Sequence, residues 1–216
     1  MRRLFSGLFL CLFMAGCGEK NTDINQTENP EVGDFIQSFP AIQLPVQFSN
    51  ANLKERFSDS FYIKSTLVSQ FVPDSLFKPD IRSLKKVKFF RKGRFTAEET
   101  KETYLFLIAE INAKSWAYLL CFDQENIYRA GMLLASTEVP ANIEEEGSLD
   151  KRLTVIKNRT RISRDGKNLY NKSAYVYNTE GLFTLILTES NEPVEEKNIY
   201  NPIDTLGKKD PLSGDY

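Results

Sequence analysis

The segment between about Leu84 and Glu189 constrains the fold most strongly, because short β-branched and aromatic runs alternate there with turn signals. Two neighbouring runs, 104–111 and 116–122, are apolar at odd and even positions alike. A strand with one face in water alternates polar and apolar residues, so these two runs are predicted to lie at the centre of a sheet or sandwich. The whole pattern predicts an antiparallel all-β meander that forms a β-sandwich or a half-closed barrel.

Glycines and charged clusters mark the turns between these runs. We expect a turn at 91–93 and an acidic loop at 144–147, which holds three successive glutamates. The sequence 164–166 is predicted as a tight hairpin turn, because Gly166 can adopt the positive φ required there. A further turn is expected at 179–181.

One strand pattern predicts which face is in water. In the run 151–163, Leu153 and Val155 have the same parity as Lys157, Arg159 and Arg161. Side chains of equal parity share one face of a strand. We therefore expect Leu153 and Val155 in the core and the basic end of the same face in solvent.

The segment before residue 84 is less regular. Pro40 and Pro45 argue against a helix over 39–48 and favour an extended, edge-like segment. Short helical turns are expected near 52–57 and 66–71.

The chain contains no histidine and three cysteines. The lack of histidine excludes Ser-His and Cys-His catalysis, histidine metal sites and imidazole acid–base chemistry. Cys11 and Cys17 lie near the N-terminus, and Cys121 lies in an apolar run, where we expect a buried and inert thiol. With so few ligating side chains no zinc site and no cofactor are expected.

The first 17 residues have the features of a secretory signal that ends at a cysteine. Two arginines precede a short apolar run, 4–15, and the small residues Ala15 and Gly16 stand just before Cys17. The run is too short to span a bilayer, which needs about 20 helical residues. These residues resemble the lipobox of bacterial lipoproteins, with an ordinary secretory signal cleaved near Gly16 as the alternative.

The resemblance to lipoproteins implies a cellular location. In that family the chain is cleaved before the cysteine, and a diacylglycerol on the thiol holds the protein on a membrane. Several acyl chains make such an anchor stable, because each buried methylene contributes about 0.8 kcal/mol. The expected location is the bacterial cell envelope, with the outer membrane favoured and its periplasmic or surface side left open.

The change in composition along the chain predicts four parts. Residues 18–34 are polar and rich in turn formers, which is typical of a flexible tether. The expected parts are a signal peptide at 1–16, a tether at 17–34, an all-β domain at 35–197 and an irregular C-terminal tail at 198–216. Apolar residues of the tail are expected to dock on the β domain, namely Ile199, Tyr200, Ile203 and Leu206.

Several short sequences resemble those of uncharacterised lipoproteins of Bacteroidota-type bacteria. They are 150–152, 158–160, 175–177, 183–189 and 201–206. The resemblance covers most of 35–216. It implies the location and the β fold and assigns no chemistry.

A cluster of basic residues interleaved with phenylalanines is the candidate binding surface. Its members are Lys85, Lys86, Lys88, Arg91, Lys92 and Arg94. Such a cluster can meet anionic head groups or acidic glycans. It is also typical of the solvated face of an edge strand, on which lysines prevent further pairing.

Paired carboxylates are the one catalytic route that the composition leaves open. A glycosidase needs two carboxyl groups about 5–10 Å apart. Acidic residues on or beside the expected strands are Glu98, Glu99, Glu102, Glu110, Asp123, Asp165 and Glu189. No catalytic residue is assigned among them.

These observations favour a non-catalytic, lipid-anchored envelope protein. The expected partners are the membrane, through lipid on Cys17, and an envelope protein or glycan. Nucleic acid is not expected, because the formal net charge is −1. The alternative is a hydrolase that uses two carboxylates on an envelope or extracellular glycan.

Overall fold

The computed structural model describes residues 31–193, which belong to one compact unit. The expected signal peptide, Cys17 and the C-terminal tail at 198–216 lie outside the described residues. The chain is already helical from Val32, inside the segment 17–34 that the sequence predicts as a tether.

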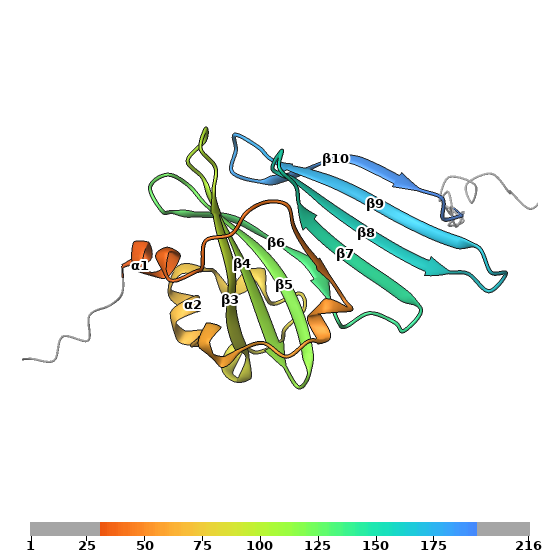
Figure 1. The fold of residues 1–216 in the computed structure, drawn as a ribbon, viewed down its shortest axis with the longest axis horizontal. Coiled ribbons are helices and arrows are strands. Elements are labelled where there is room, and N and C mark those ends of the chain that lie inside the picture. Colours follow the sequence, from red (N-terminus) through yellow and green to blue (C-terminus); the bar gives the residue numbers. More distant parts are fainter. Residues whose placement is uncertain (1–30, 194–216) are drawn as a thin grey trace, which may run out of the picture. The chain divides into compact units, whose positions relative to one another are not determined.

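The described strands form two antiparallel five-stranded sheets (Figure 1). Sheet A has the order β2-β3-β4-β5-β6, with β2 Tyr62–Ile63, β3 Lys88–Thr96, β4 Thr103–Ile111, β5 Lys114–Phe122 and β6 Tyr128–Ser136. Sheet B has the order β1-β7-β8-β9-β10, with β1 Val46–Ser49, β7 Ile143–Leu149, β8 Thr154–Ile162, β9 Asn168–Tyr177 and β10 Phe183–Ser190. The predicted all-β class is confirmed, and of the two architectures the sandwich is present.

Short helices lie between β1 and β3 and before β1. They are α1 Val32–Gln37, η1 Asn52–Lys54, η2 Asp59–Phe61, α2 Ser65–Phe71, η3 Asp74–Leu76 and η4 Leu84–Lys86, of which the η elements are 3₁₀ turns. The expected helical turns near 52–57 and 66–71 are therefore confirmed. The expected edge-like segment contains β1, which stands at one edge of sheet B.

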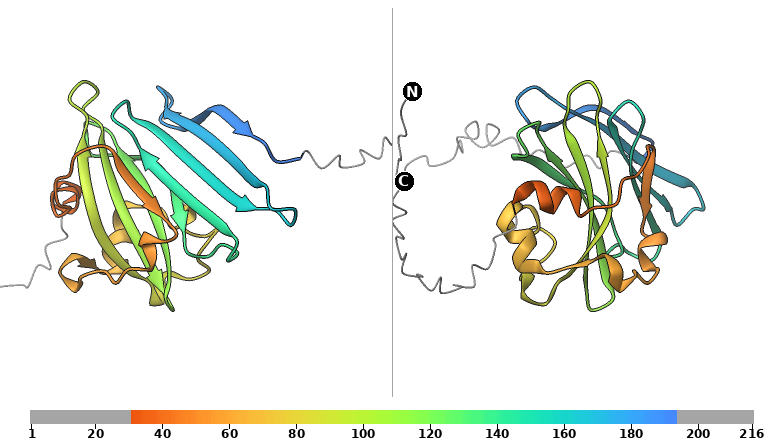
Figure 2. Two further views of the ribbon diagram at one scale, coloured as in Figure 1. Left: turned by 45° about the vertical axis from the view of Figure 1, so that its right-hand side comes forward. Right: turned by 60° about the vertical axis from the view of Figure 1, so that its left-hand side comes forward.

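Sheet A is buried on both faces (Figure 2). One face packs against α1, α2 and their connections, where Leu105 and Leu107 of β4 meet Phe35 in one apolar cluster. The opposite face holds Phe106 and Ile108 in a second cluster, which includes residues of sheet B. This double burial explains why β4 and β5 are apolar at both parities, and it confirms their predicted central position.

Sheet B extends past sheet A, so only part of its inner face is covered (Figure 1). Val155 is fully buried between the sheets, whereas Arg159, four residues further along the same face of β8, is exposed. The predicted division of this face into an apolar and a basic end is confirmed, although Leu153 precedes β8 and is only partly buried.

The turn expected at 91–93 is wrong. β3 continues through these residues as a strand, and Lys92 forms a bulge between Arg91 and Gly93. Glycine is required at position 93 for close packing, because a Cβ there would lie 2.2 Å from Cδ1 of Ile42. It allows the segment 41–42 to pack against β3.

The acidic loop expected at 144–147 is also wrong, because these residues form the middle of β7. Glu144 and Glu146 alternate with Glu145 along the strand. The carboxylate of Glu145 accepts a hydrogen bond from the backbone N–H of Ser136 at 3.0 Å. A run of like charges is therefore compatible with a strand here, since one carboxylate has a partner on β6.

Gly147 of β7 lies close against the backbone of β6 in the other sheet. A Cβ on this residue would lie 2.3 Å from the backbone oxygen of Leu134 on β6. Real Cβ contacts are essentially never this short, and the atom that the Cβ would meet belongs to the backbone, which cannot move aside as a flexible side chain can.

We predict that Gly147→Ala lowers the free energy of unfolding by about 1–3 kcal/mol, because overpacking forces β6 and β7 apart. Urea unfolding followed by circular dichroism measures this. Gly33→Ala is the matched control, since a Cβ on Gly33 meets nothing within 4 Å and alanine favours a helix. Equal stability of the Gly147→Ala variant and the parent would contradict the close approach.

Candidate ligand pocket

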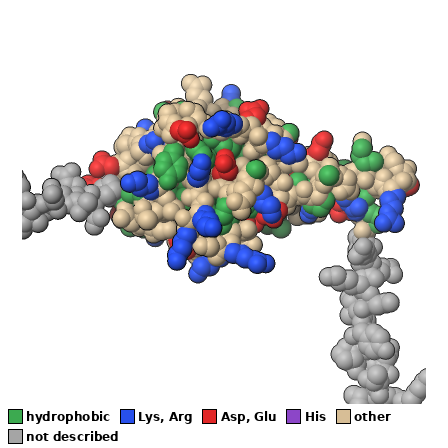
Figure 3. Space-filling model, turned by 90° about the horizontal axis from the view of Figure 1, so that it is seen from below, with side chains coloured by type: hydrophobic (Ala, Val, Ile, Leu, Met, Phe, Trp, Pro, Cys, Tyr) green, Lys and Arg blue, Asp and Glu red, His purple; other side chains and the backbone are tan. Residues whose placement is uncertain are grey.

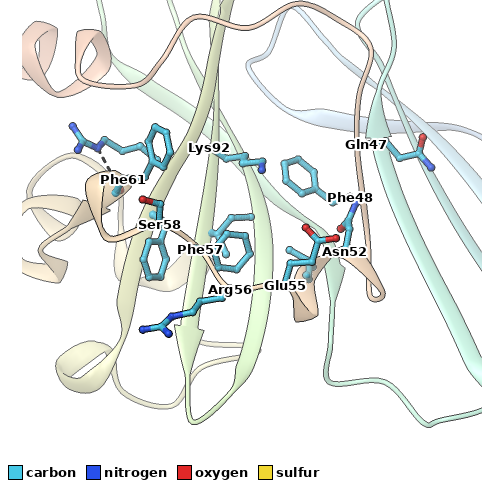
Figure 4. A pocket seen from close by; sticks show the side chains of 13 residues that line it. Gln47, Phe48, Asn52, Glu55, Arg56, Phe57, Ser58, Phe61 and Lys92 are labelled. Atoms are coloured by element: carbon cyan, nitrogen blue, oxygen red, sulfur yellow. Dashed lines mark hydrogen bonds between the residues drawn. The ribbon is translucent and has the colours of Figure 1, made fainter.

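A pocket of about 350 Å³ lies under the segment that carries the chain from sheet B to sheet A (Figure 4). This segment leaves β1 at Ser49 and enters β2 at Tyr62. The pocket is lined by Gln47, Phe48, Asn52, Leu53, Glu55, Arg56, Phe57, Ser58, Phe61, Phe90, Arg91, Lys92 and Ile108. Its volume is at the lower end of the range for small-molecule sites.

The floor of the pocket is aromatic and apolar. Phe90 and Ile108 belong to the face of sheet A that looks toward sheet B, and both are buried. The ring of Phe57 stacks at an angle on Phe90, with centroids 5.4 Å apart. Phe61 at the mouth is 43% exposed, so an apolar surface continues outward from the floor.

The mouth of the pocket is mainly cationic. Arg56 and Lys92 are exposed and take part in no ion pair among residues 31–193. Figure 4 shows the side chain of Lys92 reaching across the pocket toward Phe48, while Glu55 lies beside Asn52. Glu55 is the single acid among the lining residues.

Arg91 is a structural cation rather than a free one. Its guanidinium donates to the backbone oxygens of Ser38 and Ser60, each at 3.1 Å, and to that of Phe61 at 3.4 Å. It therefore ties the end of α1 and the 3₁₀ turn η2 to β3, and it shapes one wall of the pocket.

The predicted basic cluster does not stay together. Arg91 and Lys92 reach the pocket, whereas Arg94 bonds the side-chain oxygen of Gln37 on α1. Lys85 and Lys86 lie on η4, and Lys88 stands at the start of β3 beside Glu110. Seen from below, hydrophobic side chains are exposed among lysines and arginines on the surface (Figure 3).

Sequence reasoning missed the residues that the segment 47–61 contributes. Arg56 and Phe57 meet Lys92 and Phe90 only because the chain crosses between the sheets at this point. The one local signal was a cation next to an aromatic residue in an irregular segment, which is too common to identify a site.

The acids that the sequence offered for catalysis are scattered. Glu102 accepts from Thr100 and Tyr104 in the β3–β4 turn, and Glu189 accepts from the Tyr170 hydroxyl at 2.8 Å. At Asp123 burial opposes ionisation, but hydrogen bonds from the Ile127 N–H and from Arg129 outweigh it and lower the pKa.

Asp165 lies in the β8–β9 turn, where hydrogen bonds from Ser163 and Lys167 lower its pKa. A general acid needs a raised pKa. The two carboxyl groups with shifted pKa values in the described residues therefore move in the wrong direction for that role.

A second hollow, wide and shallow, lies mainly on the outer face of sheet B. Its volume is about 740 Å³, and its lining is mostly polar, with Glu144, Asn158, Thr160, Tyr170 and Glu189 among the residues. It has no aromatic floor comparable to that of Phe90 and Phe57. We therefore take the pocket near Phe90 as the candidate site.

Other reactive or aromatic side chains are part of the core. Cys121 is fully buried, and burial raises the pKa of its thiol to about 12. Trp116 and Tyr118 are buried as well, and the Tyr118 hydroxyl donates to Asp80 at 3.0 Å. The prediction of a buried Cys121 is confirmed.

The structure offers no further site type in its described part. No group of three or more acidic, cysteine or histidine side chains in residues 31–193 is placed to hold a metal ion. In the same residues no helix has the length and hydropathy needed to cross a membrane.

Comparisons of the chain with protein-family models, with curated proteins and with solved structures gave no match.

We predict that Arg91→Ala lowers the free energy of unfolding by about 1–2 kcal/mol, because three backbone oxygens lose a charged donor. Lys92→Ala, one residue along, is the matched control and should change stability by less than about 0.5 kcal/mol. Thermal or urea unfolding of both variants measures the difference. Equal effects at the two positions would show that the hydrogen bonds of Arg91 do not hold the segment 38–61 in place.

Proposed function

We propose that this chain is a lipid-anchored protein of the bacterial cell envelope that binds a ligand without transforming it. The ligand would combine an apolar surface with an anionic group. Support for binding comes from one feature, the pocket that is lined both by the buried residues Phe48 and Phe90 and by the exposed cations Arg56 and Lys92.

The pocket matches such a ligand on both counts. The aromatic floor can cover a sugar ring or a short acyl group, because each square ångström of apolar surface removed from water contributes about 25 cal/mol. The cations at the mouth can pair with a carboxylate, phosphate or sulfate. An acidic envelope glycan and an anionic lipid head group share this chemistry.

A hydrolytic role finds less support at this pocket. Hydrolysis of a glycan by paired carboxylates needs two acids on opposite sides of the bond. Glu55 is the single acid among the lining residues. Binding is therefore the function that the lining residues favour.

The anchor is the part of this proposal that depends on Cys17. We predict that Cys17→Ala in the producing bacterium moves the protein from the membrane fraction to the soluble fraction, because no acyl chain can be attached. Labelling with an alkynyl fatty acid should mark the parent and not the variant. The control is Cys121→Ala, which removes the buried thiol. A variant that stays with the membrane and keeps the label would contradict the anchor.

The binding chemistry can be measured with two probes that share one apolar body. Anilinonaphthalene sulfonate carries a negative charge, and N-phenylnaphthylamine is neutral; both fluoresce when they enter an apolar site. We predict tighter binding of the sulfonate. Lys92→Gln should weaken its binding about threefold and leave the neutral probe unchanged, because one exposed charge contributes about 0.5–1 kcal/mol.

Lys88→Gln is the matched control, since Lys88 is exposed on the same strand but does not line the pocket. Equal affinity for both probes, or equal effects of the two lysine variants, would contradict an anionic ligand at this pocket. Displacement of the sulfonate by an oligogalacturonate would favour the glycan, and displacement by dodecyl phosphate would favour the lipid.

A further inference from the structure

The outer edge of β10 is apolar and uncovered in the described residues. β10 is the last strand of sheet B, and β9 is its one partner there. Leu185, Ile186 and Leu187 are 51%, 57% and 52% exposed. Edge strands normally carry lysine, proline or other devices that prevent further pairing. In β10 Glu189 is the single charged residue, so this edge is suited to receive another strand.

The same part of sheet B presents a basic row on its inner face. Lys157, Arg159 and Arg161 follow Val155 along one face of β8, beyond the part that sheet A covers. Lys157 and Arg159 make no ion pair with residues 31–193, and Arg159 is exposed. An acidic segment would complement this row.

The chain leaves sheet B beside this row. Asn191 still donates its backbone N–H to the oxygen of Tyr170, at 3.3 Å. Glu192 then accepts from Nε of Arg161 at 2.9 Å. The first acid after β10 is thus already on the basic row, and the next acids in the sequence are Glu195 and Glu196.

We propose that the C-terminal segment 198–206 of this same chain runs back along the free edge of β10 and covers its apolar side chains. The segment contains Ile199, Tyr200, Ile203 and Leu206, which supply apolar surface for the exposed leucines and isoleucine. Glu195 and Glu196 fall in the connection before this segment. The proposal is independent of the ligand pocket.

The lengths agree with this arrangement. A strand of eight residues such as β10 is about 26 Å long at 3.3 Å per residue. The chain from 194 to 206 can span about 43 Å when extended, which leaves several residues for the reversal. Pro202 is compatible with an edge strand, because its missing N–H can face away from the neighbouring strand.

A second copy of the chain is the competing occupant of this edge. The segment 198–206 begins eight residues after Ser190, the last residue of β10 that pairs with β9, so its effective concentration at the edge is on the order of millimolar. A second copy would have to reach a comparable concentration to compete. The attached segment is therefore favoured.

Hydrogen exchange followed by mass spectrometry tests the proposal on the full chain carrying Cys17→Ala. We expect the amides of 183–190 to exchange at least tenfold faster in the double variant Ile199→Asp, Ile203→Asp than in the parent. Amides of β4 should be unaffected, because that strand is buried away from the edge. A chain that ends at Pro193 should show the same fast exchange in β10.

Leu212→Asp is the matched control, since it places the same charge in the tail beyond the docking segment. Equal exchange of 183–190 in parent, double variant and control would overturn the proposal. A dimer of the parent in light scattering that Leu187→Asp dissociates would also overturn it, in favour of a second copy at the β10 edge.

Discussion

Burial of sheet A on both faces is the constraint on which the rest of the structure depends. Leu105 and Leu107 point to one side of β4, and Phe106 and Ile108 point to the other. Each such side chain contributes about 1.5–3 kcal/mol when it is buried, and a domain is stable by only about 5–15 kcal/mol in total. Neither face can stay in water. The helices therefore cover one face, and sheet B with its connections covers the other.

The position of the pocket follows from how sheet B and its connections cover their face of sheet A. Sheet B is nearest to β6, since β1, β7 and β10 all contact that strand. Over β3 and β4 the cover is instead the irregular segment that links the two sheets, which buries Leu53 in the core and packs Phe57 against it. An irregular segment packs less completely than a sheet, and the pocket lies where it crosses Phe90 and Ile108.

Much of the fold could be predicted from sequence because the signals were local. Residues 104–111 and 116–122 are apolar at odd and even positions because both faces of these strands are buried. Gly166 has the positive φ of +80° that was expected of its turn, and a turn is also present at 179–181. Gly93 and Gly147 led to wrong predictions of a turn and a loop, because a glycine also allows two segments to pack closely. Here Gly93 lies against Ile42, and Gly147 lies against Leu134. Only the packed structure distinguishes the two uses of glycine.

The candidate site could not be predicted in the same way. Its residues come from three separate stretches, at 47–61, 90–92 and 108, and no spacing in the sequence joins them. The basic cluster could be recognised in the sequence, but the different roles of its members could not. The sequence contains nothing that separates Arg91, which is occupied by backbone oxygens, from Lys92, which is available to a ligand.

The fixation of α1 also has a mechanical consequence. Ser38 at its end is held by Arg91, Gln37 by Arg94, and Phe35 packs against Phe122 of a central strand. A pull on the chain from its N-terminal side thus meets side-chain contacts to β3 and β5 before it reaches any backbone ladder. Drag on a protein held at that end would load the interior of sheet A, where many strand hydrogen bonds share the force, rather than peel one strand from an edge.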